Sequence, residues 1–249
     1  MAPEASVVAI CEIIGRSEQG VTRPFICRGE DDQVYFVKGR GAGRRSLICE
    51  WIAGCFAKGF GLPIAPFAIV DVPQLLIDLG SRDDLMELGP GLAFGSQRMQ
   101  LTELTVANII EVPEASQIDV LVFDWWVRNG DRNLSSHGGN PNLFWDMVCD
   151  TLVVLDHNQA FDQAFSPESF TELHCFSAFC RKIRQDWVVQ GSLEARLRAL
   201  VADFDAICDT VPHEWWFVDD EQTIEVDFDR DEIKQMLVAC TGPAFWNFL

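Results

Sequence analysis

Basic residues are scarce in this sequence. Its 249 residues include 19 Lys and Arg against 38 Asp and Glu, which gives a formal net charge of -19. Such a charge repels phosphate backbones and anionic membrane surfaces, so the composition argues against binding nucleic acid or a membrane through a basic patch. Twelve acidic residues and one basic residue, Arg230, lie between Asp203 and Glu232. We interpret this region as a solvated acidic face, with docking of a basic partner or of divalent ions as the alternative.

Other missing features narrow the class of protein. The nine cysteines are an odd number without a C-x-x-C pair, which is typical of small buried side chains in a reducing compartment. The N-terminus has no basic region followed by a cleavable apolar run, and no stretch reaches the roughly 18 apolar residues of a membrane span. A G-x-S-x-G nucleophile elbow is absent, and the four histidines lack the spacing of a zinc site. We therefore expect a cytoplasmic globular protein.

The chain has two textures. Up to about residue 80 the chain contains short β-rich runs and one helical pattern over Arg44–Phe60, where apolar residues recur at helical spacing and Gly61 follows. Helical patterns dominate residues 101–249, interrupted by a pair of strands at Asn142–Met147 and Thr151–Asp156. Together these patterns predict an α+β fold. Strands are predicted over Val7–Ile14, Arg23–Cys27, Val34–Lys38, Phe67–Val72 and Leu75–Leu79, and helices over 113–128, 167–183, 193–209 and 229–239.

Three polar residues lie at the ends of hydrophobic segments in the middle of the chain. Asp131 follows an apolar helix, Asn142 precedes an apolar strand, and Asp156 ends the next one. Singly, each residue fits a turn or a helix cap. In this order they are the groups with which phosphotransferases hold a nucleophile and a metal ion. We predict Asp131 as the base and Asn142 and Asp156 as magnesium ligands.

Two charged residues in the first part of the chain support this interpretation. Lys38 ends the apolar run Val34–Lys38, and Glu50 lies in the following helix beside Trp51 and Ile52. A carboxylate among apolar neighbours is costly without a partner. We therefore expect Lys38 and Glu50 to pair.

Two further segments are weaker candidates for nucleotide contacts. The segment between Gly15 and Pro24 contains Gly20 and Thr22, and backbone N–H groups near glycines bind oxyanions, although a plain hairpin loop fits equally well. The stretch from Leu92 to Met99 is either a connection that places Phe94 and Met99 beside an adenine ring or an ordinary strand and loop. We include Gly20, Thr22, Phe94 and Met99 among the expected nucleotide-binding residues.

The patterns N-G-D-R at 129–132, N-P-N at 140–142 and L-D-H at 155–157 resemble those of the HipA-like kinases. These kinases belong to the protein-kinase-like superfamily, which includes phosphatidylinositol kinases. The resemblance covers about residues 15–162, and the remaining chain is similar only in its helical character. It implies a two-lobed protein-kinase-like fold, with a small β-rich N-lobe holding one helix at residues 1–100 and a larger, mainly helical C-lobe at residues 101–249.

The resemblance also implies roles in binding ATP and Mg²⁺. Lys38 would grip the phosphates and Glu50 would orient it, while Asn142 and Asp156 would hold the metal. Asp131 would orient the acceptor hydroxyl. Arg132 is expected in the catalytic site, where it would position the loop or neutralise phosphate charge.

Two departures from common kinase patterns concern these residues. Asn142 lies eleven positions after Asp131, further than in the pattern H-R-D-x-x-x-x-N. The intervening segment is flexible by composition, so Asn140 is a rival metal ligand and Asn133 a more distant one. His157 follows Asp156 where many kinases have Phe, which argues against a kinase-like Phe switch.

The resulting expectation is an ATP- and Mg²⁺-dependent kinase that phosphorylates Ser or Thr of a protein. Some HipA-like relatives are toxins that halt translation, so an antitoxin or regulatory protein is an expected partner. The resemblance also suggests Ser17 and Thr22 as autophosphorylation sites. A nucleotide-binding pseudokinase or interaction module is the alternative, and a small-molecule or lipid kinase is a third option, which the negative charge disfavours for lipids.

Overall fold

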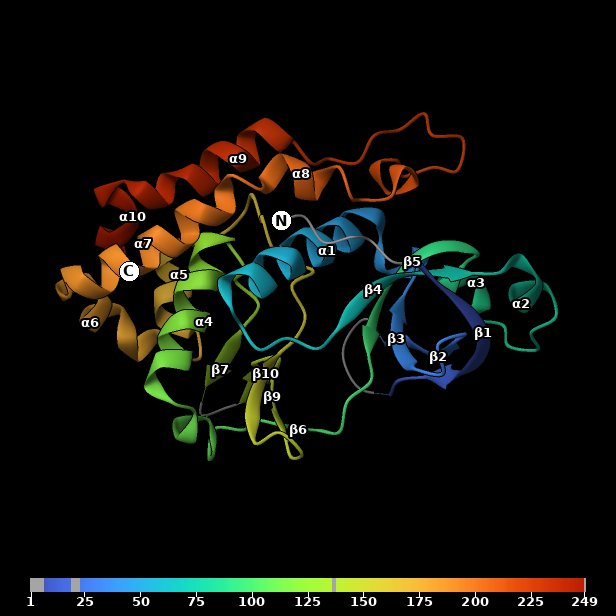
Figure 1. The fold of residues 1–249 in the computed structure, drawn as a ribbon, viewed down its shortest axis with the longest axis horizontal. Coiled ribbons are helices and arrows are strands. Elements are labelled where there is room, and N and C mark those ends of the chain that lie inside the picture. The colour runs from blue at the N-terminus through green and yellow to red at the C-terminus, as the bar shows by residue number, and fades with distance from the viewer. Residues whose placement is uncertain (1–6, 19–22, 136–137, 249) are drawn as a thin grey trace.

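A five-stranded closed barrel forms the N-terminal part of the structure, a computed structural model that describes residues 7–18, 23–135 and 138–248 (Figure 1). Strands β2 and β3 alternate between buried and partly exposed residues, which fits one face directed into the barrel. Tyr35 and Val37 therefore face the barrel core, and Lys38 lies on the opposite face. The barrel order is β1 (Val7–Arg16), β2 (Phe25–Gly29), β3 (Val34–Lys38), β5 (Gly91–Gln97) and β4 (Phe67–Val72).

Helix α1 (Arg44–Phe60) packs between the barrel and the helical part. It is buried on nearly all sides, and its apolar residues belong to the same core cluster as those of the C-terminal helices. The helix ends at Gly61, whose φ of 88° is in the left-handed region that favours glycine. In Figure 1 the barrel lies at one end of the molecule, the helices α4–α10 lie towards the other, and α1 runs between them.

The C-terminal part combines helices with two small sheets. One sheet has the order β10-β9-β6, and the other is the β7–β8 hairpin. No helix in the described ranges has the length and apolar character needed to cross a membrane. The elements are β6 (Leu101–Glu103), α4 (Glu114–Trp126), β7 (Asn133–Ser135), β8 (Gly138–Asn140), β9 (Leu143–Asp146), β10 (Thr151–Val154), α5 (Pro167–Leu173), α6 (Cys180–Gln185), α7 (Trp187–Val201), α8 (Phe204–Cys208), α9 (Arg230–Val238) and α10 (Pro243–Phe248).

The predicted α+β class, helix α1 and strand β4 are confirmed. The strand predicted over Leu75–Leu79 is wrong, because helix α2 (Gln74–Asp78) occupies this run and precedes the short α3 (Leu85–Leu88). Short apolar runs fit a strand or a helix equally well, and here Leu75 and Leu79 are exposed while Ile77 is buried.

Two predicted helices are broken in the structure. The pattern over 167–183 contains α5, a 3-10 turn at Ser177–Phe179 and the start of α6, because the chain leaves the helix at His174. The pattern over 193–209 begins earlier, at Trp187, and is divided between α7 and α8. The segment between Asp131 and Asn142, expected to be flexible, contains the strands β7 and β8.

The acidic region between Asp203 and Glu232 forms ion pairs with several cations of the same chain. Asp220 accepts a hydrogen bond from Arg40 of the N-terminal part at 2.7 Å, and Arg230 contacts Asp209 at 3.0 Å. Within the described part of the chain, no group of three or more acidic, His or Cys side chains is arranged to hold a metal ion.

Candidate active site

Lys38 lies between two carboxylates from distant parts of the chain. Its ammonium nitrogen Nζ contacts Glu50 of α1 and donates to Oδ1 of Asp156 at 2.9 Å. The other oxygen of Glu50, Oε2, accepts the backbone N–H of His157 at 3.0 Å. The Lys38 side chain is 11% exposed and that of Glu50 is 4% exposed. The sequence prediction that these two residues pair therefore agrees with the structure, and the pair also holds the segment that carries Asp156.

Burial and the neighbouring charges shift the pKa values of Lys38, Glu50 and Asp156 in opposite directions. Burial would lower the pKa of Lys38, but Glu50 and Asp156 together outweigh it and raise the pKa. Burial disfavours the Asp156 carboxylate, yet its contact with Lys38 leaves the pKa below the ordinary value. Burial raises the pKa of Glu50 and Lys38 opposes this effect. Because Nζ contacts both acids, we assign Lys38 as a cation.

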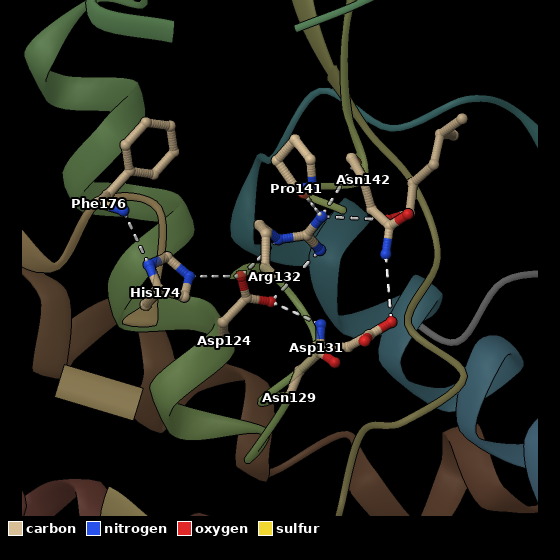
Figure 2. Close-up of polar contacts among 9 residues, drawn as sticks. Asp124, Asn129, Asp131, Arg132, Pro141, Asn142, His174 and Phe176 are labelled. Atoms are coloured by element: carbon tan, nitrogen blue, oxygen red, sulfur yellow. Dashed lines mark hydrogen bonds and ion pairs between the residues drawn. The ribbon is translucent and has the colours of Figure 1, made fainter. Parts of the chain in front are cut away.

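Asp124 of α4 is the centre of a second, fully buried network (Figure 2). Its Oδ2 accepts hydrogen bonds from Arg132 Nε at 2.6 Å and from His174 Nε2 at 3.1 Å, and its Oδ1 accepts one from Asn129 Nδ2 at 3.0 Å. His174 Nδ1 accepts the backbone N–H of Phe176 at 3.1 Å, so the proton of a neutral ring is on Nε2. Burial lowers the pKa of His174, which favours that neutral form.

Arg132 connects this network to the two segments that carry Asn142 and Asp156. Its Nη1 donates to the carbonyl oxygens of Pro141 at 2.9 Å, Asn142 at 3.0 Å and Leu155 at 3.2 Å. Arg132 is fully buried and paired with Asp124. These contacts favour the expected role of positioning the loop over that of neutralising phosphate charge. Neutralising phosphate charge directly would require an accessible guanidinium.

Asp131 and Asn142, which lie on either side of the β7–β8 hairpin, contact one another (Figure 2). Asn142 Nδ2 lies 3.4 Å from Asp131 Oδ2, which leaves the amide oxygen of Asn142 available as a ligand. Burial raises the pKa of Asp131, and the nearby Asp156 acts in the same direction. Asn142 and Asp156 have positive φ angles of 50° and 60°. This backbone conformation is uncommon outside glycine and often occurs at functional sites.

The three candidate asparagines occupy different positions. Asn133 and Asn140 pair across the β7–β8 hairpin, and Asn140 is exposed. Asn142 is nearly buried and lines the same cavity as Asp156. The hairpin thus loops out between Asp131 and Asn142 while Arg132 holds its base. This geometry favours Asn142 over its rivals.

A cavity of about 240 Å³ lies between the barrel and the β9–β10 sheet. Lys38, Glu50, Asn142, Asp156 and His157 line one part of it, and the remaining lining is largely apolar. The rings of Phe67 and Phe94 stack at a centroid distance of 5.7 Å. Phe94 and Met99, expected near the nucleotide, both line the cavity, as does Ser17, whereas Gly20 and Thr22 lie outside the described residues. The apolar lining consists of Pro24, Phe36, Gly54, Ile64, Ala65, Phe67, Phe94, Met99, Leu101, Phe144, Val154 and Leu155.

Sequence reasoning missed Asp124 and the hydrogen bonds of His174. A signal for Asp124 was present, because this carboxylate lies between Phe123 and Trp125 in an apolar helix and a buried charge requires a partner. Its partners come from positions 129, 132 and 174. Nothing in the sequence indicates that these positions meet.

A comparison with known protein families identifies the family of this chain. A family model described as HipA-like kinase matches residues 10–249. The chain belongs to the HipA-like kinase family. No curated protein matches the chain. The resemblance expected from the three motifs is thereby confirmed, and the family match extends it through the C-terminal helices.

A solved structure of a Helicobacter pylori proinflammatory kinase, CtkA, is similar to this chain with a TM-score of 0.49 and 11% sequence identity. The alignment covers 98% of this chain and 96% of that chain.

The cavity residues fit the Mg²⁺ and ATP that the family implies. The side-chain oxygens of Asn142 and Asp156 are hard ligands of the kind Mg²⁺ prefers, and Mg²⁺ commonly takes only one or two protein ligands because phosphates and water supply the rest. Lys38 provides a cation next to Asp156. The stacked rings of Phe67 and Phe94 provide an apolar wall suited to a base.

Proposed function

We propose that this protein is an ATP- and Mg²⁺-dependent kinase that transfers the γ-phosphate to a Ser or Thr hydroxyl of a protein. The observation that carries the proposal is Lys38, a buried cation held between Glu50 and Asp156 at the polar end of an otherwise apolar cavity. A lysine in this arrangement meets phosphate as a point charge with several donors. In this proposal the barrel and the helical part are the N-lobe and the C-lobe of the kinase.

The residues have distinct roles in the proposed transfer. The apolar lining would hold the base, and Lys38 would bind the phosphates, while Asn142 and Asp156 would hold Mg²⁺, which supplies charge neutralisation. Asp131 would accept the proton of the acceptor hydroxyl as the new O–P bond forms and the bond between the γ-phosphorus and ADP breaks. The raised pKa of Asp131 makes it a stronger base than an exposed carboxylate.

Arg132 and Asp124 would act through position. By holding the carbonyls of Asn142 and Leu155, the guanidinium keeps the two segments that carry the metal ligands together. An arrangement assembled before the substrate binds needs little reorganisation during transfer.

Phosphate transfer from labelled ATP to proteins of a cell lysate tests the proposal. Asp131→Asn and Asp156→Asn should both abolish transfer, and Asp83→Asn, which changes an exposed acid in the same way, should not. Asp131→Asn should still bind ATP in the presence of Mg²⁺. Binding of ATP by the unmodified protein without transfer to any acceptor would instead indicate a pseudokinase. Transfer that persists in Asp156→Asn would refute the metal assignment.

A further inference from the structure

A second cavity lies beside Arg128, three residues before Asp131. It has a volume of about 250 Å³ and is formed by the end of α4, the segment before α5, and the helices at the C-terminus. Trp125 contacts Phe165 at a ring-centroid distance of 5.5 Å and Phe245 at 6.0 Å. The walls are therefore largely aromatic. Arg128 and Ala239 also line the cavity.

This aromatic cavity is close to Asp131. Arg128, at its rim, precedes Asp131 by three residues, so their Cα atoms are within about 11 Å even if the chain is fully extended. Phe165 packs against the residue before Asp131, since a Cβ atom added to Gly130 would lie 3.6 Å from its ring. A polypeptide whose hydroxyl meets Asp131 can therefore place a residue only a few positions away in this cavity.

Arg128 gives the aromatic cavity its charge preference. Arg128 follows the end of α4 and has a positive φ of 52°, so the chain turns away from the helix axis there. Its guanidinium has no ion-pair or hydrogen-bond partner in the described ranges 7–18, 23–135 and 138–248. Lys38 and Arg132, by contrast, are paired with acids. Among the residues that the structure describes, no Asp or Glu lines this cavity. In a chain with a net charge of -19, this unpaired cation beside an apolar pocket favours an occupant that is apolar and negatively charged.

We propose that the aromatic cavity recognises the acceptor protein by taking a large apolar side chain, with an adjacent Asp or Glu of the same segment placed against Arg128. This inference rests on the proposed protein kinase activity and specifies its substrate as a segment with an apolar and acidic pair near the phosphorylated residue. Aromatic walls hold the apolar side chain by burial, and the guanidinium selects the carboxylate.

Synthetic peptides with one Ser acceptor, and with a Phe-Glu pair moved along either side of it, test the preference. The unmodified protein should phosphorylate one placement with a kcat/KM at least about tenfold above that of a peptide carrying Ala-Gln there. Arg128→Gln should reduce the preference for Glu over Gln by about three- to fivefold, the effect of one exposed ion pair. Ala239→Phe, which fills the rim, should remove the preference for Phe. Arg181→Gln, an equal charge change at an exposed position of α6, should leave both preferences intact. Equal preferences in all four proteins would overturn the proposal.

A binding measurement separates this inference from the proposed function. Fluorescence polarisation of a labelled Phe-Glu peptide should report binding to Asp131→Asn, which cannot transfer phosphate, and much weaker binding to the double variant that adds Ala239→Phe. Equal binding to both variants would refute the aromatic cavity as the recognition site. Clear binding to Asp131→Asn, together with no phosphate transfer by the unmodified protein, would support the site and reject the kinase proposal.

Discussion

Replacing Asp124 by Asn should destabilise the protein far more than its small change in shape suggests. The Asp124 carboxylate is buried and accepts hydrogen bonds from Arg132, His174 and Asn129. The variant would leave the fully buried guanidinium of Arg132 without a counter-charge, and breaking a buried pair from one side typically costs about 3–5 kcal/mol. For a chain of this length, that loss corresponds to a fall in Tm of about 6–20 °C.

Asp119 offers a matched control on the same helix. It also binds an arginine through two hydrogen bonds, to Arg196 at 2.6 and 2.8 Å, but these side chains are 26% and 36% exposed. Asp119→Asn should therefore cost about 1 kcal/mol or less. Urea unfolding at neutral pH measures both losses. If the free energies of unfolding of the two variants agree within about 1 kcal/mol, the charge of Asp124 does not stabilise the buried loop as we infer.

The difference in unfolding free energy between the unmodified protein and Asp124→Asn should depend on pH in a defined direction. Burial alone would raise the pKa of Asp124, but Arg132 and His174 outweigh it and hold the pKa below the ordinary 3.8. Because the folded pKa is depressed, the stabilisation is fully present above pH 3.8 and is lost as the pH falls towards the lower folded value. The gap in unfolding free energy between the unmodified protein and Asp124→Asn should therefore narrow below pH 4 and stay constant near neutrality. A gap that widens in acid would contradict the assignment.

Three further predictions concern the site and its connection to the barrel. Asn142→Ala and Asn142→Gly should both lower phosphate transfer by at least about tenfold, whereas Asn140→Ala should not. If activity is recovered in the Gly variant alone, the loss in the Ala variant comes from backbone strain at the positive φ of Asn142. Lys38→Met should abolish transfer and lower the free energy of unfolding by about 3 kcal/mol, because Glu50 would lose its buried counter-charge; an unchanged urea midpoint would refute this pairing. Trp215→Phe should cost about 1–3 kcal/mol in urea unfolding, because its Nε1 donates to the carbonyl of Leu92 at 2.9 Å, and a loss below about 0.5 kcal/mol would show that this bond is replaced.

Local pattern was sufficient to predict much of the fold. The period of apolar residues over Arg44–Phe60 identified α1, and the alternation over Val34–Lys38 identified β3, because each segment buries one consistent set of side chains. The run at Leu75–Leu79 failed because only Ile77 enters the core, and five residues are too few to distinguish the two periods. The hairpin β7–β8 was missed because its glycine-rich composition carries no strand signal.

The sequence by itself determined the family, the α+β class, and the types of residue available for chemistry at positions 38, 50, 131, 142 and 156. Their order along the chain carried that information because each follows or lies in a recognisable apolar segment. Only the tertiary structure decided that Arg132 is buried, that Asn142 rather than Asn140 lines the cavity, and that Asp124 and His174 support the loop. The physical reason is that burial and pairing depend on which distant segments meet, as Lys38 and Asp156 do across 118 residues, and no local pattern encodes such a meeting.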